Sequence, residues 1–167
     1  DHNINGGSLR WNFYAPNSRH FVNVYTSAQG IGRDSYYGTG KDPNAYGRTE
    51  DFTIVAGAQY SYVFNKCLFM PAQFTVGFEY TYNDLNDHSI GFDRSIMQTV
   101  RTAGMYIQNE WKNEKVNFVV GGRFDKHNMM RKIIFSPRAN LRYSPHEDVG
   151  LRVSYSSGYR APQAFDE

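Results

Sequence analysis

Apolar and polar side chains alternate along most of this chain, and this period of two constrains its fold more than any other feature. Residues 72–84 give the clearest example. Their even-numbered positions are apolar: Ala72, Phe74, Val76, Phe78, Tyr80 and Tyr82. Their odd-numbered positions are mostly polar: Gln73, Thr75, Gly77, Glu79, Thr81 and Asn83. Successive side chains of a β-strand point to opposite faces, so this pattern predicts a strand with one apolar and one polar face.

The same alternation recurs along the chain. It is regular in 51–64, 115–125, 133–144 and 149–160, less regular in 99–111, and mixed in 8–14 and 19–28. We therefore expect an all-β fold, an antiparallel up-and-down meander of about eight strands. Most of these segments are longer than the usual ~5–6 residues of a globular strand. They match the ~9–11 residues with which a tilted strand crosses a bilayer.

The predicted connections alternate in length. Residues 15–18, 65–71, 113–114 and 144–148 give short turns, 29–48 and 85–97 give long loops, and 127–132 is intermediate. Transmembrane barrels have short turns at the periplasmic rim and longer loops outside. With that orientation, the apolar face has aromatic residues near both ends of the strands, which predicts two interfacial girdles. The inner girdle is Tyr60, Tyr62, Phe64, Trp111 and Tyr143, and the outer girdle is Phe52, Tyr80, Tyr82, Phe124, Tyr155 and Tyr159.

Composition excludes several other classes. The net charge is only +2 without a basic cluster, which argues against nucleic-acid binding. The chain contains no run of about 18 apolar residues, so the sequence predicts no transmembrane helix. The chain opens without a basic start or an apolar stretch, so an export signal is expected outside this segment. The single Cys67 excludes an internal disulfide and a cysteine-based zinc site.

Two other β architectures remain open. A complete small outer-membrane barrel, structural or adhesive, would pair the strand at 8–14 with the strand at 149–159. A soluble all-β binding module would bury the Phe and Tyr faces between two stacked sheets. The last predicted strand runs into the start of another outer loop, which favours an arc of a larger wall. An open sheet edge in lipid costs several kcal/mol for each unpaired backbone group.

The tail resembles a recurrent stretch of TonB-dependent outer-membrane receptors, in which a barrel strand leaves the membrane as Gly-aromatic-Arg-Ala-Pro. Its residues here are Gly158, Tyr159, Arg160, Ala161 and Pro162. The segment from Phe135 to Pro145 resembles the strand paired with it in that family. The stretches 23–25, 33–38 and 42–47 are similar to receptors of this family from Bacteroides-type bacteria.

This resemblance implies a 22-stranded barrel, closed by a plug domain, in the outer membrane of a Gram-negative bacterium. It implies import of a scarce nutrient such as a ferric siderophore, haem or cobalamin, driven by TonB. The implied partners are outer-membrane lipid, the receptor's own plug domain, TonB and the nutrient. The sequence departs from the family pattern because we identify no plug domain, TonB box or C-terminal strand with a terminal aromatic in it. Residues 1–167 are therefore expected to be a partial transmembrane barrel.

Two groups of candidate site residues follow. The polar face carries charges expected to face the plug: Glu79, Glu110, Arg123, Arg138, Arg142 and Arg152. The loop predicted at 29–48 combines aromatic and cationic residues suited to an anionic aromatic ligand such as a catecholate siderophore. These are Arg33, Tyr36, Tyr37, Lys41, Tyr46 and Arg48.

Metal binding and catalysis are not expected. The loop at 83–94 contains Asp84, Asp87, His88 and Asp93, and a calcium site there would require several of their oxygens to converge. The five histidines are scattered, and no pairing of nucleophile and base is visible. We expect neither an enzyme nor a cofactor.

Overall fold

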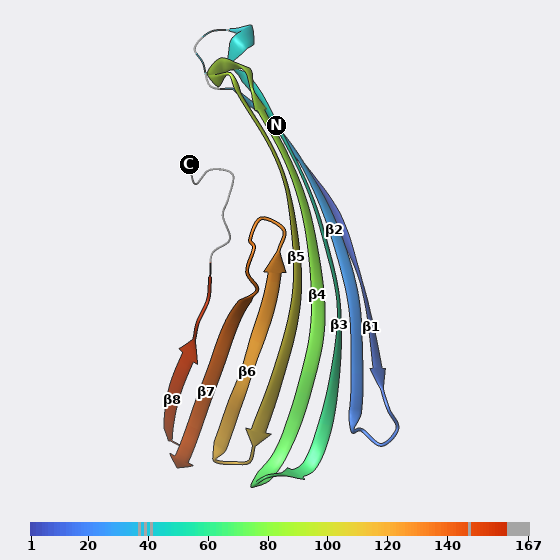
Figure 1. Ribbon diagram of the computed structural model, residues 1–167, viewed down its shortest axis with the longest axis vertical. Helices are drawn as coiled ribbons and strands as arrows, with labels where there is room; N and C mark the ends of the chain where they lie inside the picture. Colours follow the sequence, from blue (N-terminus) through green and yellow to red (C-terminus); the bar gives the residue numbers. More distant parts are fainter. Residues whose placement is uncertain (37, 39, 41, 147, 160–167) are drawn as a thin grey trace.

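The chain forms one antiparallel β-sheet, in which every strand pairs with its neighbours in sequence (Figure 1). The structure is a computed structural model that describes residues 1–36, 38, 40, 42–146 and 148–159. Its strands are β1 (His2–Tyr14), β2 (His20–Tyr36), β3 (Tyr46–Cys67), β4 (Met70–Ser89), β5 (Arg94–Lys112), β6 (Val116–His127), β7 (Ile134–His146) and β8 (Val149–Ser156). Two short 3-10 helices, η1 (Pro43–Ala45) and η2 (Ile90–Phe92), lie at outer connections. The predicted meander of eight long strands is confirmed.

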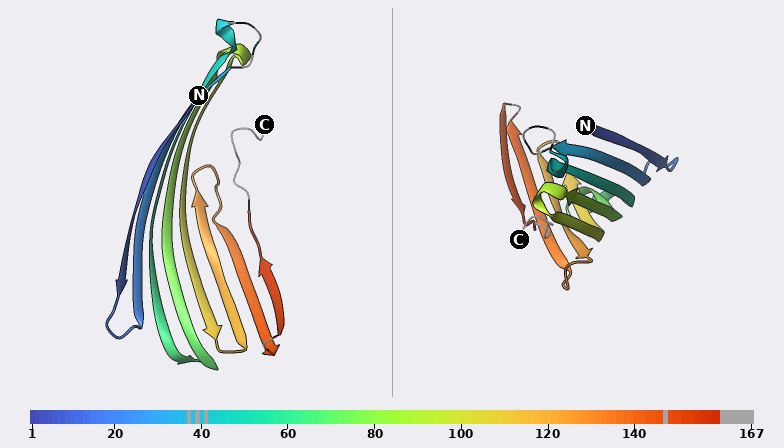
Figure 2. Two further views of the ribbon diagram at one scale, coloured as in Figure 1. Left: turned by 180° about the vertical axis from the view of Figure 1, so that it is seen from behind. Right: turned by 90° about the horizontal axis from the view of Figure 1, so that it is seen from above.

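The sheet is bent into an open arc (Figure 2). Its strand order runs from β1 to β8, and no ladder in the described ranges pairs β1 with β8. The ladder that would close a small barrel is thus not seen. All eight strands belong to one sheet, so the stacked sheets of a soluble sandwich are also not seen. The described part of the chain has no helix that is both long and apolar enough to cross a membrane.

Register places the two predicted faces on opposite sides of the whole sheet. The pairings Ala58↔Phe78 and Phe78↔Met105 continue one apolar row, and Gly57↔Glu79 and Glu79↔Gly104 continue one polar row. We call the side with Phe78 the apolar face and the side with Glu79 the polar face. Within the residues that the structure describes, no second layer covers the apolar face: Phe78 is 52 % exposed and Met105 50 %. An apolar face of this size is unusual on a monomeric soluble protein.

Turn chemistry explains the tight inner connections. The Asn113 carboxamide oxygen accepts the backbone N–H groups of Lys115 at 3.0 Å and Val116 at 2.7 Å. Asparagine commonly stabilises turns in this way because its side chain replaces a backbone acceptor. This short hairpin sets the register of β5 against β6, in which Trp111 pairs with Phe118.

The prediction of two long loops is wrong for most of their length, because strands extend into both segments. β2 continues to Tyr36 and β3 begins at Tyr46, so much of 29–48 is paired strand. Likewise β4 continues to Ser89 and β5 begins at Arg94, within the loop predicted at 85–97. These extensions form an arm that rises beyond β6 and β7 (Figure 1). Both faces of the arm carry polar residues, so the alternation that marks a strand elsewhere is absent there.

Candidate lumen face and outer arm

A connected group of charged and phenolic side chains crosses the polar face. The Tyr25 hydroxyl donates to Glu79 Oε2 at 2.5 Å, and Arg123 donates to Glu79 Oε1 at 3.1 Å. Arg123 Nε also donates to Asp125 Oδ1 at 2.8 Å. These contacts connect β2, β4 and β6 across the strands between them. They add side-chain links to a sheet otherwise held by backbone pairing.

Glycines on the intervening strands make room for these long side chains. Gly57 on β3 lies under the Tyr25 ring, and a Cβ placed there would overlap the ring. Gly77 on β4 lies in the same way under Tyr106, whose hydroxyl donates to Gln59 Oε1 at 2.7 Å. Each tyrosine therefore lies across a glycine and contacts a polar group two strands away. Aromatic side chains that cover strand glycines in this way help to hold sheet register.

All six charges predicted to face a plug lie on the polar face, but their surroundings differ. Glu79 and Arg123 are already paired within the wall. Glu110 accepts from Asn117 Nδ2 at 2.7 Å, and Arg138 donates to Gln108.

Arg142 and Arg152 stand directly opposite each other on β7 and β8. Among the residues that the structure describes, no carboxylate forms an ion pair with either. Like charges directly opposite in a ladder destabilise the pairing, so this position favours an anionic partner.

The candidate ligand residues of the outer arm are not brought together. Arg33 pairs with Thr49 in the ladder and lies on the polar face. Tyr36, Tyr46 and Arg48 lie on the other face. The rings of Tyr36 and Tyr46 are 4.9 Å apart, and Arg48 forms an ion pair with Glu50 at 2.8 Å. Tyr37 and Lys41 lie outside the described residues, as do Arg160, Ala161 and Pro162 of the family motif.

The four residues considered for calcium do not converge. Asp84 faces the apolar side beside Phe52, whereas Asp87 faces the polar side beside Thr49. Within the described part of the chain, no three metal-binding side chains form a cluster. The strand extension explains this result because alternate positions of β4 point to opposite faces.

Asp87 instead stabilises the outer arm. Its carboxylate accepts from Thr49 Oγ1 at 2.6 Å and from Arg94 at 2.8 Å, and the residue is 8 % exposed. It lies beyond Tyr82, where the apolar row ends, and therefore outside the apolar band. The hydrogen bond from Thr49 and then the contact with Arg94 hold the pKa of Asp87 below its ordinary value, although burial opposes this shift.

This depressed pKa predicts a pH-dependent arm. The folded state binds the Asp87 proton less readily than the unfolded state, so its stabilisation is fully present above the ordinary aspartate pKa of about 3.8. It should be lost as pH falls through the lower folded value. We expect the stability difference between the native protein and Asp87→Asn to be constant near neutral pH and to shrink below about pH 4. Amide hydrogen exchange in 46–51 and 85–89 would measure it, and an unchanged difference at low pH would contradict it.

Sequence reasoning missed Tyr25, Tyr106 and Asp125 as parts of the polar-face group. A signal was present, because Gly57, Gly77 and Gly104 interrupt strands otherwise rich in larger residues. A glycine inside a strand often marks the close approach of another group. The identity of that group depends on the register of several hairpins.

Comparison with known proteins agrees with this architecture. The family model described as "TonB dependent receptor-like, beta-barrel" matches residues 1–167. No curated protein matches the chain. Among solved structures, a chain of the FpvAI–pyocin S2 complex is similar with a TM-score of 0.64 and 14 % identity, covering 93 % of this chain and 25 % of that one. The siderophore receptor PirA from Pseudomonas aeruginosa is similar with a TM-score of 0.55 and 14 % identity, covering 97 % of this chain and 34 % of that one. At this identity the likeness shows the fold, and the chain spans only about a quarter to a third of these structures.

Proposed function

The chain belongs to the TonB-dependent receptor β-barrel family, and on that premise we propose that it forms part of the wall of an outer-membrane receptor importing a scarce nutrient. Barrels of this family reside in the outer membrane of Gram-negative bacteria and serve as receptors and transporters. The proposal adds that this chain lies in that membrane, with its apolar face in lipid and its polar face toward the lumen. The uncovered apolar face is the observation that carries it.

The dimensions of the apolar face fit a bilayer. On β3 the outward row runs from Phe52 to Phe64, and at about 3.4 Å per residue this is roughly 40 Å of strand. A tilt of about 45° reduces it to roughly 30 Å, the thickness of a hydrocarbon core. The row ends in aromatic residues, and Trp111 stacks between Phe69 and Phe118 with ring centroids 5.5 and 5.6 Å away. Such rings suit the membrane interface.

Spin labels would test this orientation. We expect labels at Ala56 and Phe78, both on the apolar face, to be relaxed by a lipid-soluble quencher and protected from a water-soluble one. A label at Val55, on the polar face of the same strand, is the matched control and should respond only to the water-soluble quencher. Protection of Ala56 and Phe78 from both agents would mean a buried core and would overturn the membrane assignment.

The imported nutrient is proposed to be a ferric siderophore, with haem and cobalamin as alternatives. The name of PirA describes it as a siderophore receptor, and its fold likeness supports this class. Arg33 lies on the polar face of the arm, where an anionic ligand entering the lumen could reach it. Uptake by the full receptor of iron-labelled ferric siderophore, iron-labelled haem and cobalt-labelled cobalamin, each offered alone, would separate these ligands. Energy would come from TonB, acting through a plug domain in the complete protein.

We propose that Arg142 and Arg152 contact an acidic group of that plug. Replacing both with glutamine should weaken plug retention in the full receptor and increase leakage of small hydrophilic antibiotics. The same change should relieve repulsion in the wall and leave its stability unchanged or raised by about 0.5 kcal/mol. Arg131→Gln combined with Lys132→Gln, both in the outer connection after β6, removes the same number of positive charges and is the control. Unchanged leakage with both arginines replaced would contradict plug contact.

A further inference from the structure

The outer end of β5 has one edge that no neighbouring strand covers in the described part of the chain. β5 begins at Arg94, whereas its pairing with β6 begins only at Thr102, opposite His127. Figure 1 shows the upper part of β5 rising beyond the connection between β6 and β7. This part of β5 lies past Tyr82, where the apolar row ends, and therefore outside the apolar band. An uncovered strand edge is a template on which another extended chain can pair.

The side chain of Asn128 imitates a backbone amide at the lower end of this edge. The backbone N–H of Asn128 donates to the carbonyl oxygen of Arg101 at 3.0 Å, and Asn128 Oδ1 accepts from the N–H of Arg101 at 3.0 Å. Asn128 Nδ2 donates to the carbonyl oxygen of Thr99 at 2.8 Å. These bonds continue the ladder beyond the end of β6. They also show which way the backbone groups of β5 point.

Backbone groups above Asn128 remain open on the same edge. In an antiparallel ladder, alternate residues direct both of their backbone groups to the same side. Because Arg101 directs both groups toward β6, Thr99, Met97 and Ser95 do so as well. Among the residues that the structure describes, the N–H of Thr99 and both backbone groups of Met97 and Ser95 have no hydrogen-bond partner. An extended peptide added to the sheet would pair with these groups.

The charge around this edge favours an acidic partner. Residues 93–101 and 126–132 contain five cations and one carboxylate, Asp93. Gln98 Nε2 donates to Met129 Sδ at 3.4 Å, so the connection between β6 and β7 lies beside the edge. The cations are Arg94, which is paired with Asp87, and Arg101, Lys126, Arg131 and Lys132.

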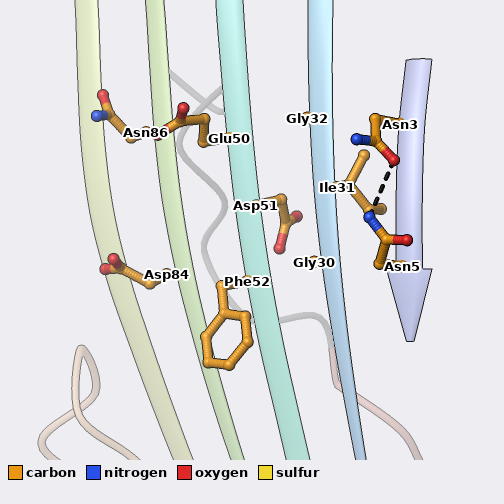
Figure 3. A pocket seen from close by; sticks show the side chains of 10 residues that line it. All are labelled: Asn3, Asn5, Gly30, Ile31, Gly32, Glu50, Asp51, Phe52, Asp84 and Asn86. Carbon is orange, nitrogen blue, oxygen red and sulfur yellow. Dashed lines mark hydrogen bonds between the residues drawn. The ribbon is translucent and has the colours of Figure 1, made fainter. Parts of the chain in front are cut away.

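Carboxylates lie on the other strands of the arm. Glu50 and Asp51 stand on β3, two strands from β5, and Asp84 stands on β4 (Figure 3). An acidic segment is therefore repelled by the β3 side of the arm and attracted to the β5 edge. A second copy of this chain is a poor occupant, because pairing two β5 edges would bring both sets of cations together. Met97 is 79 % exposed and offers one apolar contact to an added strand.

We propose that the outer edge of β5 binds an extended acidic segment of another protein as an added strand, with an apolar side chain beside Met97. Backbone hydrogen bonds would supply the affinity, and the surrounding cations would supply the preference for acidic sequences. The inference goes beyond nutrient import. It rests on the proposed membrane orientation for placing this edge outside the cell.

Amide hydrogen exchange in the full receptor tests whether the edge is open. The N–H groups of Ser95, Met97 and Thr99 should exchange faster than those of Ile96 and Gln98, which pair with β4 in the same strand. Addition of a short labelled peptide of alternating glutamate and valine residues should slow the first set only. Equal protection of both sets without the peptide would mean that another part of the receptor covers the edge, and would overturn the proposal.

Peptide affinity for the detergent-purified full receptor tests the backbone pairing. Met97→Pro removes an N–H that points away from β4, a position where edge strands tolerate proline, and should lower affinity about tenfold. Met97→Ala keeps this N–H and should lower affinity by a smaller factor. Undiminished binding by Met97→Pro would overturn the proposal.

The same titration tests the charge preference. Arg131→Gln combined with Lys132→Gln should lower affinity about fivefold at low salt. Lys112→Gln combined with Lys115→Gln, at the opposite end of the strands, removes the same charge and should change nothing. Equal binding of a peptide with lysine in place of glutamate would contradict the acidic preference. A receptor without lipid-accessible labels at Ala56 and Phe78 would refute the proposed function instead, while peptide binding at the edge could still be measured in detergent.

Discussion

Replacing Glu79 with alanine is expected to lower the free energy of unfolding by about 2–3 kcal/mol, because hydrogen bonds to charged groups contribute about 1.5–3 kcal/mol each. Glu79 accepts from Tyr25 on β2 and from Arg123 on β6. Arg123 keeps its contact with Asp125 after the substitution, and water can reach part of the site, so the two losses should not add in full. Equilibrium unfolding of the folded receptor in vesicles would measure the change.

A double-mutant cycle would separate this network from a local effect. If the Tyr25–Glu79 contact stabilises the sheet, Tyr25→Phe and Glu79→Ala together should cost less than the sum of the single changes. Glu110→Ala is the matched control, since Glu110 accepts only one side-chain hydrogen bond among the described residues, from Asn117, and should cost about 1.5 kcal/mol. Additive effects of Tyr25→Phe and Glu79→Ala would show that the contact contributes nothing.

The strands and faces within the apolar band were predictable from sequence because one physical requirement acts on every residue there. Phe74, Val76 and Phe78 must share a face if one side is apolar, and the period of two follows directly. The arm was mispredicted because this requirement ends above Phe52 and Tyr82. There, Asp87 and Thr49 stabilise strand pairing through a hydrogen bond whose partners lie 38 residues apart, and no local pattern marks it.

The contacts within the polar-face network could not be predicted from the sequence for a related reason. Glu79 and Arg123 were both identified as lumen charges, but their pairing with each other depends on the registers of β4 with β5 and of β5 with β6. A slip of one residue in either hairpin would turn one partner to the other face. Tyr25 and Gly57 are uncharged, so the charge pattern of the sequence does not mark them as parts of the network. Sequence therefore predicted which face each charge occupies, while three-dimensional pairing decides which charges are already paired within the sheet.

Replacing Ala58 on β3 with arginine should lower the free energy of unfolding much more than replacing Val55 on the same strand with arginine. Ala58 is the middle residue of the row from Phe52 to Phe64, so its side chain would lie near the bilayer midplane in the proposed orientation. An arginine at that depth costs about 2–4 kcal/mol on the lipid face of a barrel. The guanidinium would have to reach the interface past Tyr80 or Tyr60, and either route leaves it partly desolvated.

Val55→Arg is the control, because it places the same cation on the opposite face of the same strand. Val55 lies on the same strand but on the polar face, where it pairs with Thr81 and where an added cation stays hydrated. Its cost should be well below 1 kcal/mol, typical of substitutions away from buried features. Unfolding both variants in lipid vesicles compares the faces within one strand. Similar costs at Ala58 and Val55 would mean that lipid does not cover the apolar face, whereas a large difference would show that the period of two in this sequence records the boundary between lipid and lumen.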